Sequence, residues 1–162
     1  MADSDTDDLD ICLIDALQNN ALSTLAELGT LVGLKRPAVH ERIKRLEKRG
    51  YILGYGAKVD YARIGLGLVA LVSIYTLPDI EYEQFYAQLS ALPEVTVMYS
   101  VAGEESFVAQ VITRSTGHLD DFLARIKSVK GIARTKTAVV LSTPFDRRSV
   151  PVERLLDRHG QL

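Results

Sequence analysis

The most chemically distinctive part of the sequence is a run of positive charge. Residues 35–49 hold seven Lys or Arg and two Glu, although the 162-residue chain has a formal net charge of -2. Residues 1–34 hold seven Asp or Glu and no Lys or Arg, so acids and bases are segregated. Clustered cations neutralise nucleic-acid phosphates, although a charge run on its own is more often a solvated helix face. The segregation favours binding to double-stranded DNA.

The residues that usually perform catalysis or hold metals show no working arrangement. His40, His118 and His159 lie on separate predicted elements without metal-ligand spacing, and P-loop, nucleophile-elbow and dinucleotide motifs are absent from the sequence. Cys12 is the only cysteine, which suits a reducing cytoplasm. The N-terminus is acidic rather than basic, and no apolar run is long enough for a membrane span. We expect a cytoplasmic protein that is not an enzyme and has no metal, cofactor or membrane partner.

Three short helices are predicted to position the basic run. The first begins at Asp8, and the second begins after Thr24, which has the spacing of a capping box with Glu27, and ends at Gly33. The third has Pro37 in its first turn, where a missing N–H costs nothing. Together they predict a helix-turn-helix unit. The inward positions would be Leu25, Leu28, Leu31 and Val32 in the second helix and Val39, Ile43 and Leu46 in the third.

The polar side of the third helix is the expected DNA-contacting surface. In a helix-turn-helix this helix lies in the major groove, where its bases neutralise phosphates and its first residues approach base edges. Arg42 lies nearer the apolar side, where it could equally brace the helix. The candidate DNA-binding residues are Lys35, Arg36, Pro37, His40, Arg42, Lys44, Arg45 and Lys48.

The second half of the sequence alternates strand and helix patterns. The order strand-helix-strand-strand-helix-strand is that of a ferredoxin-like α+β fold. Both helices would cover one face of the sheet, so the other face would expose apolar residues and is expected to meet a second copy in a two-fold dimer. The predicted strands are 66–77, 95–102, 107–114 and 133–143, and the predicted helices are 80–92 and 118–129.

The glycine-rich segment 51–67 is expected to contain a short strand and a hinge between two domains. The expected division is a helix-turn-helix domain with its linker strand at 1–60, a ferredoxin-like oligomerisation and effector domain at 61–145, and a tail at 146–162. The tail would either reach a neighbouring subunit or fray.

Several stretches in combination resemble one protein family. "STLAELGTLVGLKRPAVHERIKRLEKRGYILGYGAKVDYARIGLG" is followed by "PEVTVMYSVAGEES" and "GIARTKTAVVLST". This combination resembles the Lrp/AsnC (leucine-responsive, or feast/famine) transcriptional regulators over about residues 8–143. The resemblance implies a winged helix-turn-helix, a ferredoxin-like RAM (regulation of amino-acid metabolism) domain, a homodimer that assembles into tetramers or octamers, and control by a small amino acid.

The resemblance also implies an effector site, with contributions from a neighbouring subunit. A glutamate would meet the ammonium of an amino acid, and N–H or hydroxyl groups would meet its carboxylate. An ordinary polar turn is the alternative for the loop 103–106. The implied residues are Tyr99, Gly103, Glu104, Glu105, Ser106, Thr135 and Thr137.

The sequence departs from the family pattern at two places. Lys35 and Arg36 stand where members often have a serine N-cap, and Ser106 stands where an acid is expected. A base at a helix N-terminus opposes the helix dipole by about 0.3–1 kcal/mol and forfeits a cap, a cost that a nearby phosphate would offset. Two other functions stay open: a DNA-organising protein without an effector, and a ligand-binding module whose basic helix has no DNA role.

Overall fold

The computed structural model describes residues 6–146 and 149–156. The chain divides into two compact units, Met1–Lys58 with Phe145–Leu162 and Val59–Pro144. The first of these, which holds the predicted helix-turn-helix, is called the helical unit below. The described part of the tail belongs to this helical unit and does not stand apart. His159 and the rest of the tail's end lie outside the described residues. No helix in these ranges is long and apolar enough to cross a membrane.

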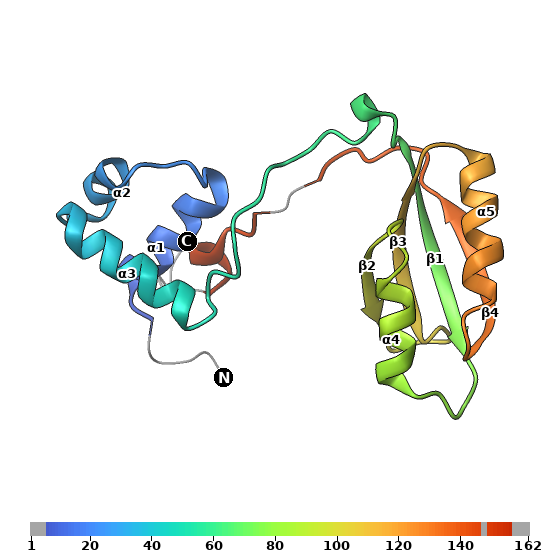
Figure 1. Cartoon of the computed structure of the whole chain (residues 1–162). Coiled ribbons are helices and arrows are strands. Elements are labelled where there is room, and N and C mark those ends of the chain that lie inside the picture. Colours follow the sequence, from blue (N-terminus) through green and yellow to red (C-terminus); the bar gives the residue numbers. More distant parts are fainter. Residues whose placement is uncertain (1–5, 147–148, 157–162) are drawn as a thin grey trace. The chain divides into compact units, whose positions relative to one another are not determined.

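The helical unit contains α1 (Asp8–Asn19), α2 (Leu25–Val32), α3 (Arg36–Lys48) and a short α6 (Val152–Leu155), as Figure 1 shows. The predicted capping box starts α2: the Thr24 hydroxyl accepts a hydrogen bond from the Glu27 N–H, and the Glu27 carboxylate accepts one from the Thr24 N–H. Gly33 ends α2 with a φ of 68°, which glycine adopts without strain. These two local predictions are confirmed.

One apolar cluster holds the three long helices together. Val39, Ile43 and Leu46 are buried on α3, as predicted. The prediction for Leu31 was wrong, because the eight-residue α2 turns only a narrow stripe inward and leaves this side chain 57% exposed. The buried residues of the cluster are Leu13, Leu17, Leu28, Val32, Val39 and Ile43.

Gly29 permits a close contact at the turn between α2 and α3. A Cβ at this position would lie 2.6 Å from the Leu34 carbonyl oxygen. The Leu34 N–H donates to the Gly29 carbonyl at 2.9 Å. Gly33 was predicted only to end the second helix, and Gly29 is a second glycine with a steric role at this turn.

The strand predicted within residues 51–67 is not formed. Residues 51–60 are irregular, and the segment contains only a 3-10 turn, η1 (Ala62–Ile64). A strand needs a hydrogen-bonded neighbour, and the described residues of this unit include no other strand. Gly54, with a φ of 156°, further interrupts an extended run. The wing implied by the family resemblance therefore has no strand in the described helical unit.

The described part of the tail packs on α1 of its own chain. The Gln18 side-chain amide donates to the Val150 carbonyl at 3.3 Å and accepts from the Val150 N–H at 3.2 Å. At the start of α6, the Asp15 carboxylate accepts a hydrogen bond from the Val152 N–H at 3.0 Å. The described part of the tail is therefore not frayed, and the reach to a neighbouring subunit stays a prediction.

The second unit is the predicted ferredoxin-like α+β fold (Figure 1). Its strands pair antiparallel in the order β2-β3-β1-β4. The elements in chain order are β1 (Leu68–Thr76), α4 (Tyr82–Ser90), β2 (Val95–Ser100), β3 (Phe107–Thr113), α5 (Thr116–Lys127) and β4 (Ile132–Val139).

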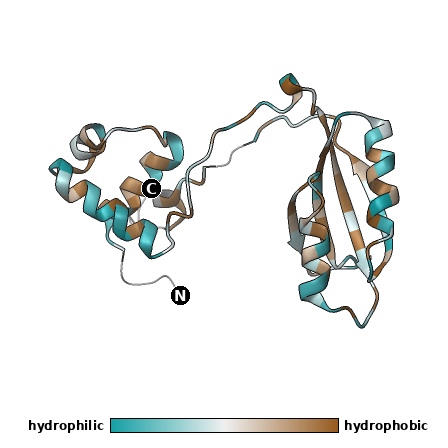
Figure 2. Cartoon of the chain, viewed as in Figure 1, coloured by the Kyte–Doolittle hydropathy of each residue, from teal (hydrophilic) through white to brown (hydrophobic). Residues whose placement is uncertain are grey.

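Both helices pack on one face of the sheet, and Figure 2 shows how apolar its strands are. Phe85 of α4 and Phe122 of α5 are buried against alternate residues of β1 and β3. The opposite face is open in the single chain. It carries Leu71, Val97 and Tyr99, which share a face by register and are 43%, 37% and 55% exposed.

A buried carboxylate, Glu94, joins the start of β2 to α5. It accepts a hydrogen bond from His118 Nε2 at 3.0 Å and another from the Arg125 guanidinium. The Arg114 N–H donates to His118 Nδ1, which leaves Nε2 as the nitrogen that donates to Glu94. Burial raises the pKa of Glu94, but the hydrogen bonds from Arg125 and His118 help to outweigh burial and hold its pKa below the ordinary value.

Candidate nucleic-acid interface and effector loop

The start of α3 lacks a side-chain cap. Lys35 occupies the N-cap position with extended backbone and makes no capping hydrogen bond, and Arg36 and Pro37 open the helix. The first N–H groups of the helix are therefore accompanied by two cations instead of a capping hydroxyl. This end of α3 is electropositive through its side chains and its backbone alike.

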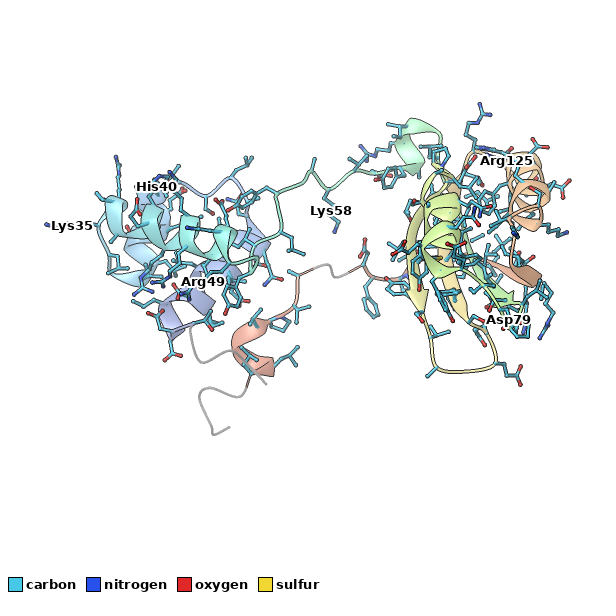
Figure 3. All side chains as sticks on the ribbon, turned by 60° about the horizontal axis from the view of Figure 1, so that its bottom comes forward. Lys35, His40, Arg49, Lys58, Asp79 and Arg125 are labelled. Atoms are coloured by element: carbon cyan, nitrogen blue, oxygen red, sulfur yellow. The ribbon has the colours of Figure 1, made fainter. Side chains whose placement is uncertain are left out.

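Four cations of the candidate set project from α3 or its start into solvent. Lys35, Arg36, Lys44 and Lys48 are all exposed, and Figure 3 shows Lys35 projecting from the helical unit. None of the four forms an ion pair within residues 6–146 and 149–156. His40 is also exposed. This side of α3 therefore offers uncompensated positive charge, which suits a polyanion.

Arg42 and Arg45 differ from these four cations because they pair with Asp7 and Asp10 at the start of α1. Arg42 lies 2.7 Å from Asp7 and 2.8 Å from Asp10, and Arg45 lies 2.8 Å from Asp10. Of the two alternatives for Arg42, bracing the helix or contacting phosphate, this geometry matches bracing, whereas Arg45 had been placed on the outward face. Its side chain is 44% exposed, yet its guanidinium turns to Asp10.

The ion pairs also affect titration. Hydrogen bonds to Asp10 and Asp7 raise the pKa of Arg42. Burial raises the pKa of Asp7, but hydrogen bonds from the Asp10 N–H and Arg42 outweigh burial and lower it. Neither aspartate was predicted from the sequence to have this role, because both counted only as part of an acidic N-terminus. A charged residue one position before Ile11, within an apolar helical pattern, was the available signal.

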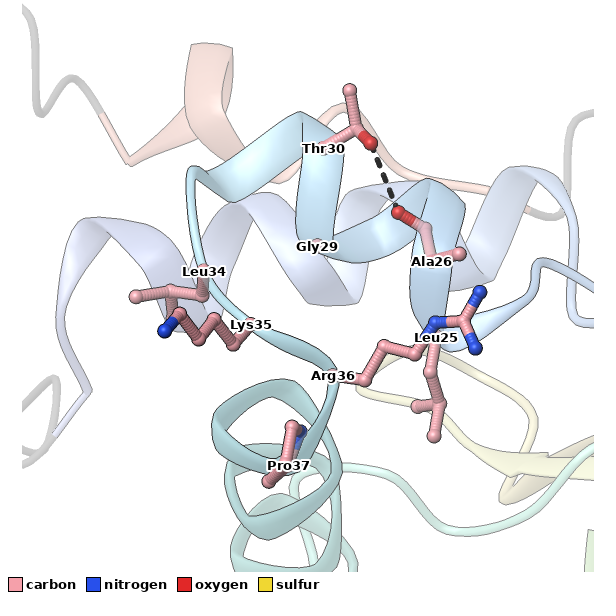
Figure 4. Close-up of a pocket in the computed structure, with 8 residues that line it drawn as sticks. All are labelled: Leu25, Ala26, Gly29, Thr30, Leu34, Lys35, Arg36 and Pro37. Atoms are coloured by element: carbon pink, nitrogen blue, oxygen red, sulfur yellow. Dashed lines mark hydrogen bonds between the residues drawn. The ribbon is translucent and has the colours of Figure 1, made fainter.

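A hollow of about 480 Å³ lies beside the start of α3. Figure 4 shows its lining, in which apolar residues of α2 and the turn lie next to the two cations. The Thr30 hydroxyl donates to the Ala26 carbonyl, so its hydrogen is used within α2. The hollow is lined by Leu25, Ala26, Gly29, Thr30, Leu34, Lys35, Arg36 and Pro37.

The candidate effector loop follows β2 and leads into β3. Gly103 and Glu104 are exposed, whereas Glu105 lies half-buried with its carboxylate 3.5 Å from the Ser73 hydroxyl. Ser106, which replaces the expected acid, has its hydroxyl 2.8 Å from that of Thr76. The serine therefore ties the loop to β1, and the exposed carboxylate of this loop is that of Glu104.

The remaining effector candidates do not come together in one chain. Tyr99 lies on β2, at one edge of the sheet, and Thr135 and Thr137 lie on β4, at the other edge. The two threonines are half-buried opposite Ile74 and Val72 of β1. A site that uses both edges requires residues from a second copy, as the resemblance implied. Among the described residues, no group of three or more His, Cys, Asp or Glu could hold a metal.

Comparison with known families matches both units. The model of the AsnC-type helix-turn-helix domain matches residues 7–47, and that of the Lrp/AsnC ligand binding domain matches residues 69–150. The HTH-type transcriptional regulator LrpA of Mycobacterium tuberculosis is 38% identical over 146 residues, which is 90% of this chain and 97% of LrpA. Residues after 150, including α6, lie beyond both matched regions.

Solved structures of Lrp/AsnC proteins agree with these family matches. The crystal structure of the Mycobacterium tuberculosis leucine response regulatory protein LrpA, at 38% identity, covers 87% of this chain and 96% of its own with a TM-score of 0.78. The complex of transcriptional regulator NMB0573 from Neisseria meningitidis with L-Met is 26% identical and covers 93% of this chain and 99% of its own, with a TM-score of 0.86. The feast or famine regulatory protein Rv3291c from M. tuberculosis, complexed with L-methionine, is 38% identical and covers 88% and 96%, with a TM-score of 0.82. The chain belongs to the Lrp/AsnC family of transcriptional regulators.

Proposed function

We propose that the protein regulates transcription by placing the outer face of α3 on duplex DNA and responds to a small amino acid. One observation carries the DNA-binding part. Lys35, Arg36, Lys44 and Lys48 are exposed and form no ion pair within the described ranges, whereas the other side of the same helix is buried in the core. Such a helix can approach phosphates without losing existing contacts. The cytoplasm is the proposed place of action.

The open face of the sheet supports a homodimer. Leu71, Val97 and Tyr99 give this face an apolar character that a second copy would remove from water. A two-fold dimer would carry two copies of α3, as paired DNA half-sites require. We propose further assembly into tetramers or octamers from the family resemblance.

The loop after β2 supports an amino-acid effector. Two structurally similar regulators are complexes with L-methionine, so we propose a free amino acid of this kind as the ligand class. We assign the ammonium to Glu104, the exposed carboxylate, or to Glu105, which contacts Ser73. The hydroxyl groups of Thr135 and Thr137 from a second copy would serve the carboxylate.

Fluorescence anisotropy with the DNA upstream of the protein's own gene tests the DNA-binding part. Lys44→Gln should weaken binding and lower the slope of log K against log salt by about 1, because one phosphate contact is lost. Lys127→Gln, which removes an exposed cation from α5, is the matched control and should change neither value. Equal effects of the two variants would contradict a role for α3, and absent binding would favour the ligand-binding module.

The unusual start of α3 has its own test. Lys35→Ser and Arg36→Ser should each reduce DNA affinity and the salt slope, although serine at the N-cap would stabilise the helix by about 0.5–2 kcal/mol. An increase in helix stability combined with weaker DNA binding would indicate that the two cations serve DNA binding rather than the stability of the fold. Unchanged affinity and slope would refute the proposal for these two residues.

Thermal shift with each of the twenty amino acids, starting with L-methionine, tests the effector part. The binding amino acid should raise the melting temperature of the wild type, because a ligand that binds only the folded state stabilises it. Glu104→Gln should reduce this shift, and Glu83→Gln, an exposed acid on α4, should not. If no amino acid changes either melting or DNA binding, the effector-independent DNA-organising function is favoured.

A further inference from the structure

Asp10 is an almost fully buried charge at the junction of α1 and α3. Its side chain is 1% exposed, and both of its carboxylate oxygens are used. One oxygen accepts hydrogen bonds from Arg42 at 2.8 Å and from Arg45 at 3.1 Å, and the other accepts from Arg45 at 2.8 Å. Asp7, which caps α1, adds a second carboxylate to Arg42.

This geometry restricts how α3 can turn against α1. A buried carboxylate is costly unless it is paired, so movements that separate Asp10 from its arginines are strongly opposed. Arg42 and Arg45 are three positions apart and therefore lie on one side of α3. They flank Ile43, which is buried in the core. Charge pairing and core packing thus specify the same rotation of the helix.

The same contacts divide the cations of α3 into two groups. Arg42 and Arg45 are balanced by Asp7 and Asp10, and their guanidinium groups are directed to α1. Lys44, which lies between them in the sequence, is exposed and forms no ion pair in the described part of the chain. Neighbouring positions on one helix therefore differ in whether their charge is already paired within the described residues.

We propose that Asp10 is a positioning residue for DNA recognition: it fixes the rotation of α3 through Arg42 and Arg45 and thereby removes these two bases from phosphate binding. The inference rests on the proposed DNA-binding function and assigns different roles to bases that look equivalent in the sequence. The phosphate-contacting group is then Lys35, Arg36, Lys44 and Lys48.

The first test compares two aspartates of α1 in the full-length chain. Asp8→Asn removes an exposed acid and should leave DNA binding unchanged or slightly tighter, because the protein gains positive charge. Asp10→Asn makes the same change in charge but should weaken binding by roughly tenfold or more, the equivalent of losing one base contact. Charge alone predicts the opposite sign for Asp10→Asn, so binding equal to that of Asp8→Asn would overturn the proposal.

The second test counts phosphate contacts by salt dependence. Arg45→Gln should leave the slope of log K against log salt unchanged, whereas Lys44→Gln should lower it by about 1. A fall in slope for Arg45→Gln as large as that for Lys44→Gln would overturn the assignment. This readout separates a bracing role from a phosphate contact, since a loss of helix stability alone does not change the number of ions released.

Hydrogen exchange of α3 keeps the inference distinguishable from the proposed function. If the wild type fails to bind DNA, the proposed function fails, but exchange still reports whether Asp10 holds α3. The α3 amides should exchange faster in Asp10→Asn than in Asp8→Asn. Equal protection in the two variants would show that Asp10 does not fix the helix.

Discussion

The substitution Gly29→Ala tests whether the turn of the helix-turn-helix depends on close backbone contact. The added Cβ would lie 2.6 Å from the Leu34 carbonyl oxygen. That atom belongs to the backbone and cannot rotate away as a flexible side chain would. The Leu34 N–H also donates to the Gly29 carbonyl at 2.9 Å, so a shift of either residue strains this hydrogen bond.

Two opposing contributions set the size of the effect. Alanine is better than glycine within a helix by about 0.5–1 kcal/mol. Overpacking costs about 1–3 kcal/mol, and a strained hydrogen bond costs up to about 1 kcal/mol. The steric terms are larger, so we expect Gly29→Ala to destabilise the helical unit by about 2 kcal/mol.

Hydrogen exchange with mass spectrometry can measure this loss within the helical unit. A local destabilisation of about 2 kcal/mol should make the α2 and α3 amides exchange about thirtyfold faster. Gly56→Ala is the matched control, since its Cβ would meet nothing within 4 Å and Gly56 has no positive φ. Its expected effect is a gain of about 0.4–1 kcal/mol. Exchange in Gly29→Ala as slow as in the control would refute the steric argument.

Three further predictions concern the other contacts. The lowered pKa of Glu94 means that its interactions with Arg125 and His118 stabilise the fold above the ordinary pKa of 4.5 and lose this effect as pH falls. Arg125→Gln should therefore lower the free energy of unfolding by about 1 kcal/mol near neutral pH and by less in acid. Melting temperatures of the wild type and the variant measured across pH test this, and a difference between them that did not narrow in acid would contradict the prediction. Gln18→Ala should speed exchange in the tail while leaving α3 protected, and unchanged tail exchange would show that its two hydrogen bonds contribute little. Leu71→Arg should convert dimers to monomers in sedimentation experiments, because a charge would be buried at the proposed interface, and an unchanged mass would count against that interface.

The parts of the fold that depend on neighbouring residues could be predicted from the sequence. The capping box of Thr24 and Glu27 and the left-handed Gly33 follow from the chemistry of adjacent positions. The strand and helix order of the second unit follows from hydrophobic periodicity over short windows. The predictions of a buried Leu31 and of a strand within 51–67 were wrong, because helix length and strand pairing depend on surrounding elements.

The candidate site shows the same limit. Sequence and spacing identified α3 as the basic helix, and the absence of a cap at Lys35 was expected from residue type alone. They gave no reason to separate Lys44 from Arg45, since both appear as bases on the polar side of one helix. The distinction depends on Asp10, which is 35 positions away from Arg45 in the chain.

The sequence by itself determined where charge, helix ends and apolar stripes lie, because these properties depend on residues within one or two turns of each other. Only the tertiary structure decided which bases are free. Burial of Asp10 makes an unpaired carboxylate costly, and the packing of α1 on α3 brings Arg42 and Arg45 within hydrogen-bonding distance of it. Lys35, Arg36, Lys44 and Lys48 lie beyond its reach and form no ion pair within the described residues, and these are the bases that we propose for DNA binding.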